Sequence, residues 1–275
     1  MLKYIRIVLV VLFCLALAGA GSLYFYNYTH EDTQPPAFSK ETELVEVSVT
    51  DPQQALLRGL AAYDNVDGDV TDRIKIKSIS QLVNETDVIV TYIVFDNSSN
   101  YAVCDRTARY TDYTSPRFSL SKPMLFNTGE TVTFLDRISV IDQRDGNITG
   151  RLKLEESTVV STIPGTYRAM LSATNLMGDT VYLPLTVQVV NKSVTLPTIE
   201  LSEYLVYLDV GSPKRFRSYL KGVRDPMDSE GAFPSKVTIN SKAVDTSTPG
   251  VYEVYYYYTG KSGEIGTAIL TVVVE

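Results

Sequence analysis

A short apolar stretch that runs into a turn rich in Asp, Asn and Gly occurs three times along this chain. The first copy is the stretch 57–64 with the turn 65–71, and the second begins 78 residues after Leu57, at Leu135. A third, shortened copy follows at 220–230. Asp, Asn and Gly tolerate the backbone angles of tight turns. Because the same unit recurs at a long, regular spacing, we predict tandem modules.

A second landmark, Pro-Gly-x-Tyr, opens an alternating stretch in two of the copies. It begins at Pro164 and at Pro249, whereas the first copy has its alternating stretch at 88–95 without the Pro-Gly. In the stretch 167–174, apolar and polar residues alternate, as in a strand that is buried on one face. A polar turn and a closing strand follow each stretch. Many short strands with turns between them predict immunoglobulin-like β-sandwiches.

Prolines mark the predicted boundaries between modules, at Pro35-Pro36, Ser115-Pro116 and Leu196-Pro197. We therefore predict an all-β fold of three tandem immunoglobulin-like β-sandwiches, each with a core of its own. Short linkers are expected to join them into a semi-rigid rod. The predicted domains are 36–114, 115–191 and 192–275.

The motifs together resemble a known family. The pattern Asp-x-x-Asp-Gly-Asp-hydrophobic-Thr at 64–71, with the later Pro-Gly-x-Tyr and alternating strands, resembles the bacterial immunoglobulin-like modules of Gram-positive surface proteins. These modules are named after their copy in a pesticidal crystal protein. The resemblance covers 36–275 and is weakest in the third module, where the turn reads Asp228-Ser229-Glu230. It implies a spacer, adhesive or ligand-binding role, and it brings no catalytic residues.

The run 7–26 contains no charged residue. Twenty residues of helix span about 30 Å, the thickness of the hydrocarbon core of a bilayer. Lys3 and Arg6 precede the run and Glu31 and Asp32 follow it, which predicts a cytoplasmic N-terminus. We therefore predict a single-pass protein of the cell membrane with extracellular C-terminal domains. Its parts are a cytoplasmic tail 1–6, a transmembrane helix 7–26 and a linker 27–35.

Two other readings of this run remain open. Ala18-Gly19-Ala20 has the small residues of a signal-peptide cleavage site. Against cleavage, the apolar run is longer than a usual signal core and aromatic residues flank its outer end. Lipid attachment at Cys14 is less favoured, because the bulky Phe13 precedes it.

The composition limits the partners that the chain can have. Its formal net charge is −7 and its pI is near 4.9, so neither nucleic acid nor anionic lipid is an expected ligand. Its two cysteines are Cys14, in the apolar run, and Cys104, so no disulfide within a module is expected. Cys104 aligns with Leu183 on the inward face of a closing strand, which predicts a small core residue. An intermolecular disulfide or a reactive thiol is the alternative.

No catalytic or cofactor-binding residues are predicted. The one His, His30, stands at the end of the apolar run beside acidic residues. A single His without a second His or a nearby Cys makes no ordinary zinc site, and it leaves no base for a hydrolytic triad in the modules. We therefore expect that the chain is not an enzyme.

Asp64, Asp67, Asp69 and Asp72 concentrate four carboxylates in the first turn. Carboxylate oxygens are the ligands that calcium prefers, so these residues are a candidate weak calcium site. The twelfth-position Glu and the flanking helices of an EF-hand are absent. The alternative is that the side chains cap backbone amides of the turn.

Four consecutive tyrosines occupy the alternating stretch of the third module. If Tyr252 points inward, Tyr256 and Tyr258 follow it into the core, and Tyr255 and Tyr257 face outward. Exposed tyrosines are frequent in recognition surfaces, which makes this pair a candidate ligand-binding site. The preference of strands for aromatic residues is the alternative explanation.

Two functions follow from these observations. The first is a structural, adhesive or ligand-presenting surface protein that meets a protein or glycan ligand through its third module. The second is a non-catalytic scaffold subunit of a membrane-bound complex of the cell envelope.

Overall fold

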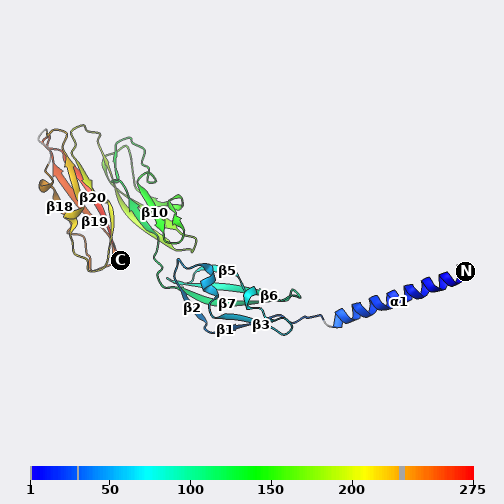
Figure 1. The fold of residues 1–275 in the computed structure, drawn as a ribbon. Helices are drawn as coiled ribbons and strands as arrows, with labels where there is room; N and C mark the ends of the chain where they lie inside the picture. The colour runs from blue at the N-terminus through cyan, green and yellow to red at the C-terminus, as the bar shows by residue number, and fades with distance from the viewer. Residues whose placement is uncertain (1, 30, 229–232) are drawn as a thin grey trace. The chain divides into compact units, whose positions relative to one another are not determined.

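In the computed structural model, residues 2–29, 31–228 and 233–275 are described. His30 therefore lies outside the described residues, as do Ser229 and Glu230 of the third turn. The chain divides into two compact units, Met1–Thr111 and Asp112–Glu275. One helix near the N-terminus precedes a succession of β-strands (Figure 1). The predicted fold class, β-sandwiches after one apolar helix, is confirmed.

The helix α1 (Leu2–Thr29) includes the whole apolar run. Its segment Lys3–Tyr26 has a mean hydropathy of 2.4, and none of this segment is buried against the rest of the protein. The large apolar side chains of this segment are exposed, which is unfavourable in water. The helix is long and apolar enough to cross a membrane, a property that a signal sequence near the N-terminus shares.

The first sandwich follows α1 in the unit Met1–Thr111. Its strands are β1 (Ala37–Lys40), β2 (Leu44–Val47), β3 (Leu60–Asp64), β4 (Gly68–Asp69), β5 (Lys75–Leu82), β6 (Asp87–Phe95) and β7 (Tyr101–Tyr110), and its 3₁₀ helices are η1 (Gln53–Leu57) and η2 (Thr71–Arg73). One sheet has the order β1-β3-β4 and the other β2-β7-β6-β5. The strands β2 and β7 pair in parallel, and β6 pairs antiparallel with β5 and β7.

The alternation in β6 places one of its faces in the core of the first sandwich. Val88, Val90, Tyr92 and Val94 are fully buried, and the residues between them are not. On β7 the inward position 106 is held by Arg106, which is buried too. Its guanidinium donates hydrogen bonds to the carbonyl of Arg58 and to the hydroxyl of Thr42, so the charged group replaces an apolar side chain. This is why the alternation of apolar residues is interrupted at this position.

The second sandwich begins the unit Asp112–Glu275. Its elements are β8 (Arg117–Leu120), β9 (Leu125–Asn127), β10 (Ile138–Asp142), β11 (Gly146–Asn147), η3 (Thr149–Arg151), β12 (Lys153–Ser157), β13 (Gly165–Thr174) and β14 (Thr180–Val190). The sheets have the orders β11-β10-β8 and β12-β13-β14-β9. The parallel pair, β9 with β14, corresponds to the pair β2 with β7 in the first sandwich.

The third sandwich completes this unit. Its elements are β15 (Thr198–Leu201), β16 (Leu205–Leu208), η4 (Phe216–Tyr219), β17 (Leu220–Arg224), η5 (Pro234–Lys236), β18 (Thr238–Asn240), β19 (Gly250–Thr259) and β20 (Ile265–Val274). The sheets have the orders β15-β17 and β16-β20-β19-β18. Again the parallel pair, β16 with β20, joins an early strand to the closing strand.

The tyrosine of each Pro-Gly-x-Tyr motif bonds back to the chain that precedes its strand. The hydroxyl of Tyr167 donates to the carbonyl of Ile163 at 2.8 Å, and that of Tyr252 donates to the carbonyl of Thr248 at 2.9 Å. A Cβ atom on Gly165 would lie 3.3 Å from the hydroxyl of Tyr167. A side chain at this position would be in tight contact with the ring of the tyrosine, which lies against the backbone there, so the motif favours Gly.

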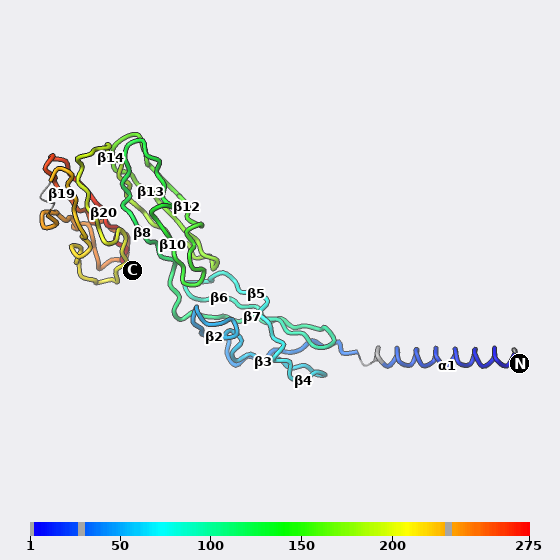
Figure 2. The backbone as a smooth tube through the Cα atoms, turned by 45° about the horizontal axis from the view of Figure 1, so that its top comes forward, coloured from blue at the N-terminus to red at the C-terminus, as the bar shows by residue number. Residues whose placement is uncertain are grey.

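The second and third sandwiches share one apolar cluster. Buried residues of both, from Phe118 to Val274, belong to the same continuous core. The hydroxyl of Tyr207 in β16 accepts a hydrogen bond from the backbone N–H of Phe118, and Arg117 forms an ion pair with Glu275. Figure 2 traces the backbone of this unit, in which β19 and β20 lie beside the second sandwich. The two sandwiches are thus parts of one compact unit.

Candidate functional site

The repeated Asp at the end of each short strand holds the turn that follows it. In the first sandwich, Oδ1 of Asp64 accepts hydrogen bonds from the backbone N–H groups of Val66 at 2.9 Å and Asp67 at 2.8 Å. Asp142 binds the corresponding N–H groups of the second turn through its own Oδ1. An Asp at this position therefore favours the turn in both copies. This is the capping role that was the alternative to calcium binding.

The structure does not bring the four carboxylates of the first turn to one point. Oδ2 of Asp67 accepts hydrogen bonds from the backbone N–H of Asn97 at 2.7 Å and from Arg73 at 2.9 Å. These contacts hold the pKa of Asp67 below its ordinary value, with Asn97 as the largest cause. Asp69 accepts from Thr71, whose hydrogen bonds lower the pKa of Asp69. Asp72 is exposed.

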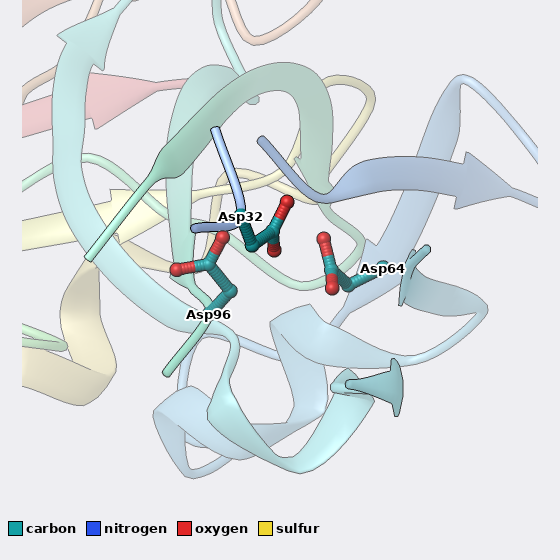
Figure 3. A group of neighbouring side chains, drawn as sticks. All are labelled: Asp32, Asp64 and Asp96. Atoms are coloured by element: carbon teal, nitrogen blue, oxygen red, sulfur yellow. The ribbon is translucent and has the colours of Figure 1, made fainter. Parts of the chain in front are cut away.

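Asp64 instead meets two carboxylates from distant parts of the chain. Within the described residues, a group of three carboxylates whose oxygens lie within 4.8 Å of one another is formed by Asp32, Asp64 and Asp96. Asp32 precedes β1, Asp64 ends β3 and Asp96 follows β6. Figure 3 shows the three side chains close together, with the carboxylates of Asp32 and Asp64 facing each other. Asp64 and Asp96 are 8% and 7% exposed.

The three carboxylates differ in how their oxygens are satisfied. Both oxygens of Asp96 accept hydrogen bonds from Asn100, from its backbone N–H and from its side-chain amide, each at 2.8 Å. Oδ1 of Asp32 accepts from the backbone N–H of Gln34 at 3.0 Å. Oδ2 of Asp64 is buried and has no hydrogen-bond partner. A buried carboxylate oxygen without a donor is costly, so this group of residues is a candidate cation site.

Asp32 and Asp96 are not recognised as site residues from the sequence. They lie 32 residues before and after Asp64 (positions 32, 64 and 96), and no local spacing connects them. The available signal is positional, since Asp96 is the first residue after an alternating strand and Asp32 stands four residues before Pro36. Neither position predicts proximity until the two sheets are packed together.

The second candidate site is on β19, where the predicted alternation is confirmed. Val254, Tyr256 and Tyr258 are buried, and Tyr255 and Tyr257 lie on the other face, half-buried. The rings of this pair are stacked, with centroids 6.1 Å apart and planes within 7° of parallel. The hydroxyl of Tyr255 donates to Glu253 at 2.7 Å. Burial, with Glu253 as the second cause, raises the pKa of Tyr255 to about 12.

Residues of the second sandwich lie next to Tyr255. Tyr255 lines a cleft of about 370 Å³. The walls of this cleft come from the second sandwich on one side, with Arg168 and Thr186, and from the third on the other, with Tyr252 and Glu253. Its polar groups include a guanidinium, a carboxylate and hydroxyls. An outward-facing aromatic pair beside such a cleft has the amphipathic character of a recognition surface.

The cysteines are the last of the residues singled out in the sequence. Cys104 lies on the inward side of β7 but is only half-buried, in the first half of the strand. Its thiol contacts the carbonyl of Asp105 at 3.6 Å. Cys14 lies in α1 and is exposed. Both are free thiols, so Cys104 is not the fully enclosed core residue that alignment with Leu183 predicts.

No protein-family model matches the chain. The chain is 26% identical over 211 residues to the pesticidal crystal protein Cry22Aa of Bacillus thuringiensis, an alignment that covers 74% of this chain and 28% of that protein. The chain thus spans little more than a quarter of the length of this relative. The resemblance inferred from the repeated motifs is supported as a distant sequence similarity.

The solved structures that the chain is similar to have low sequence identity and low TM-scores. One is the M60 catalytic domain with the CBM51-1 and CBM51-2 domains of Clostridium perfringens ZmpB, 12% identical, with a TM-score of 0.25 over 88% of this chain and 31% of that one. Another is Drosophila N-cadherin EC1-4, 13% identical, with a TM-score of 0.23 over 89% of this chain and 76% of that one.

Proposed function

We propose that this chain is a non-catalytic binding or adhesive protein that α1 anchors in the cell membrane, with its sandwiches displayed outside. The observation that carries the proposal is an unburied apolar helix followed by β-sandwiches. Lys3 and Arg6 lie on one side of the apolar run and Glu31 and Asp32 on the other, which favours a cytoplasmic N-terminus. A non-catalytic role agrees with a single His that stands outside the modules.

The membrane topology is the first test of this proposal. Protease added to intact cells is expected to remove a tag placed after Glu275 and to leave a tag placed before Met1 protected. Lysis of the cells should then expose the N-terminal tag to the same protease, which controls for tag resistance. A mature chain that begins near Gly21 and is released into the medium would show that the helix is a cleaved signal.

The ligand that we propose is a protein or a glycan, met by the third sandwich. Tyr255 and Tyr257 form a stacked aromatic pair beside a cleft with polar groups of both signs, Arg168 and Glu253. Aromatic rings with hydroxyl groups bind apolar faces and accept or donate hydrogen bonds at the same surface. The net charge of −7 disfavours nucleic acid.

A scaffold role within a membrane-bound complex of the cell envelope is the second candidate. It is favoured by the apolar cluster that joins the second and third sandwiches into one unit, because a scaffold must keep its binding surfaces in a constant arrangement. Crosslinking on intact cells, followed by purification of the tagged chain, distinguishes the two roles. Partners from the same membrane support the scaffold, and wall or host ligands support the adhesive protein.

A further inference from the structure

The carboxylates of Asp32, Asp64 and Asp96 form an arrangement that is unfavourable without a positive charge. Their oxygens lie within 4.8 Å of one another, and two of the three side chains are more than nine-tenths buried. Carboxylates at such distances repel one another when ionised. Oδ2 of Asp64, which has no hydrogen-bond donor, is buried within this group. A polar oxygen in such surroundings requires a partner that the protein itself does not supply.

The second sandwich has the same construction but satisfies the corresponding oxygen. Asn175 takes the place of Asp96, since each is the first residue after the long strand and donates its N–H to the carbonyl four residues later. The amide of Asn175 donates to Oδ2 of Asp142 at 2.9 Å. The hydroxyl of Tyr113 accepts from Asn175 at 2.8 Å and donates to Asp179 at 2.7 Å. In the second sandwich, side chains of the protein therefore donate the hydrogen bonds that these carboxylates need.

In the third sandwich, a backbone N–H satisfies the corresponding carboxylate oxygen. Asp225 takes the place of Asp64, and its Oδ2 accepts the N–H of Lys261 at 2.8 Å. Gly260 takes the place of Asp96, and a Cβ atom there would lie 2.5 Å from the ring of Pro197. A carboxylate has no room at this position. The concentration of three carboxylates around an unsatisfied oxygen is thus a feature of the first copy, not of the repeat.

We propose that Asp32, Asp64 and Asp96 bind one calcium ion. Calcium takes six to eight oxygen ligands at about 2.3–2.6 Å, so two ligands on opposite sides of the ion are about 5 Å apart. The oxygens of the three side chains, within 4.8 Å of one another, fit this span. The unsatisfied Oδ2 of Asp64 becomes a ligand, and water molecules complete the shell. Asp32 lies between α1 and β1. Through its carboxylate, the ion would fix the segment that follows α1 against the first sandwich.

This site differs from the calcium site that the sequence alone predicts, and it does not depend on the adhesive function. The cluster Asp64, Asp67, Asp69 and Asp72 contributes Asp64 alone. Calcium sites of extracellular modules have dissociation constants of about 10⁻⁴–10⁻³ M, and we expect a value in this range because the segment with Asp32 must be held in place.

The test uses the full chain in detergent micelles, with calcium as the probe. Titration with calcium, followed by direct measurement of the bound ion, is expected to saturate at one ion per chain. Calcium should also raise the melting temperature of the first sandwich by several degrees over a sample with chelator, because the ion binds the folded state. Equal melting with calcium and with chelator, or no bound calcium, would overturn the proposal.

Two variants distinguish this site from the turn cluster. D96N places the residue of the second copy in the first, so calcium binding should weaken at least tenfold. The same variant should melt at a higher temperature than the wild type in chelator, because the new amide can donate to Asp64. D72N is the matched control: it also removes one charge from this sandwich, and its calcium binding should stay unchanged. Loss of binding in D72N with binding retained in D96N would place the ion in the turn and refute the proposal.

Discussion

At the scale of single residues, the tyrosine pair of β19 shows how far alternation predicts surface character. The position of Tyr255 and Tyr257 on the face opposite Val254 follows from the two-residue period of a strand. The partial burial of Tyr255 does not, because the second sandwich contributes Thr186 and Arg168 to the cleft that Tyr255 lines. The pair is therefore preorganised by stacking and by packing, and a preorganised aromatic surface loses little entropy when it binds.

Replacing Tyr255 and Tyr257 together by Ser is expected to weaken binding of the protein or glycan ligand by about 1–3 kcal/mol. The reason is the loss of two aromatic anchors from the surface. Binding is measured by titration of the immobilised full chain with the ligand that an array screen selects. Tyr63→Ser is the matched control, since Tyr63 is an exposed strand tyrosine of the first sandwich, 54% exposed. Equal binding by the double variant and the control would exclude the pair as the contact.

At the scale of elements, two of the sandwiches each have a buried tyrosine that connects an inner strand to a 3₁₀ helix. The hydroxyl of Tyr92 in β6 donates to the carbonyl of Leu56 in η1 at 2.7 Å, and that of Tyr256 in β19 donates to the carbonyl of Phe216 in η4 at 2.6 Å. Both tyrosines have no exposed surface. Each stands four residues before the turn residue, Asp96 or Gly260, and Leu171 occupies this place in the second sandwich. In both sandwiches, the hydroxyl therefore satisfies a backbone carbonyl of the 3₁₀ helix.

Tyr92→Phe and Tyr256→Phe are each expected to lower the free energy of unfolding by about 1–2 kcal/mol. The ring remains packed, but a buried carbonyl loses its donor. Urea unfolding followed by circular dichroism measures the change, and Tyr63→Phe, at an exposed position, should have no effect. Unchanged stability in both buried variants would mean that water or a backbone group replaces the lost donor.

At the scale of the whole molecule, the chain consists of two compact units although its motifs repeat three times. The unit Asp112–Glu275 contains the second and third sandwiches with one apolar cluster. Within it, Tyr207 binds the backbone of Phe118, and Arg117 pairs with Glu275. Stability is cooperative within such a shared core and independent between units that lack one.

Calorimetry of the full chain is therefore expected to show two unfolding transitions for the sandwiches, one for each unit. Truncation after Asn191 should leave the first transition unchanged and lower or abolish the second, because the second sandwich loses the partner of its apolar cluster. The separate core that the sequence predicts for each module leads instead to the expectation that the truncated second module stays folded. Three separate transitions in the full chain would support that simpler picture.

The local features of the protein follow from its sequence. Alternation with a period of two places Val254, Tyr256 and Tyr258 on one face of a strand. Asp and Gly residues form the turns, and an uncharged run of 20 residues forms a helix, because each of these outcomes depends on neighbours within a few residues. The buried Arg106 is an exception, since carbonyl and hydroxyl acceptors from distant segments make its inward position possible.

The tertiary structure alone decided which side chains meet. Asp32, Asp64 and Asp96 come from three separate segments, and their approach depends on the packing of one sheet against the other. The same packing in the second sandwich brings Asn175 to Asp142 and yields a hydrogen bond in place of a group of carboxylates. A sequence pattern records the order of residues along the chain, whereas the electrostatic cost of a buried carboxylate depends on its neighbours in space. For that reason the turn was predictable from the sequence and the proposed calcium site was not.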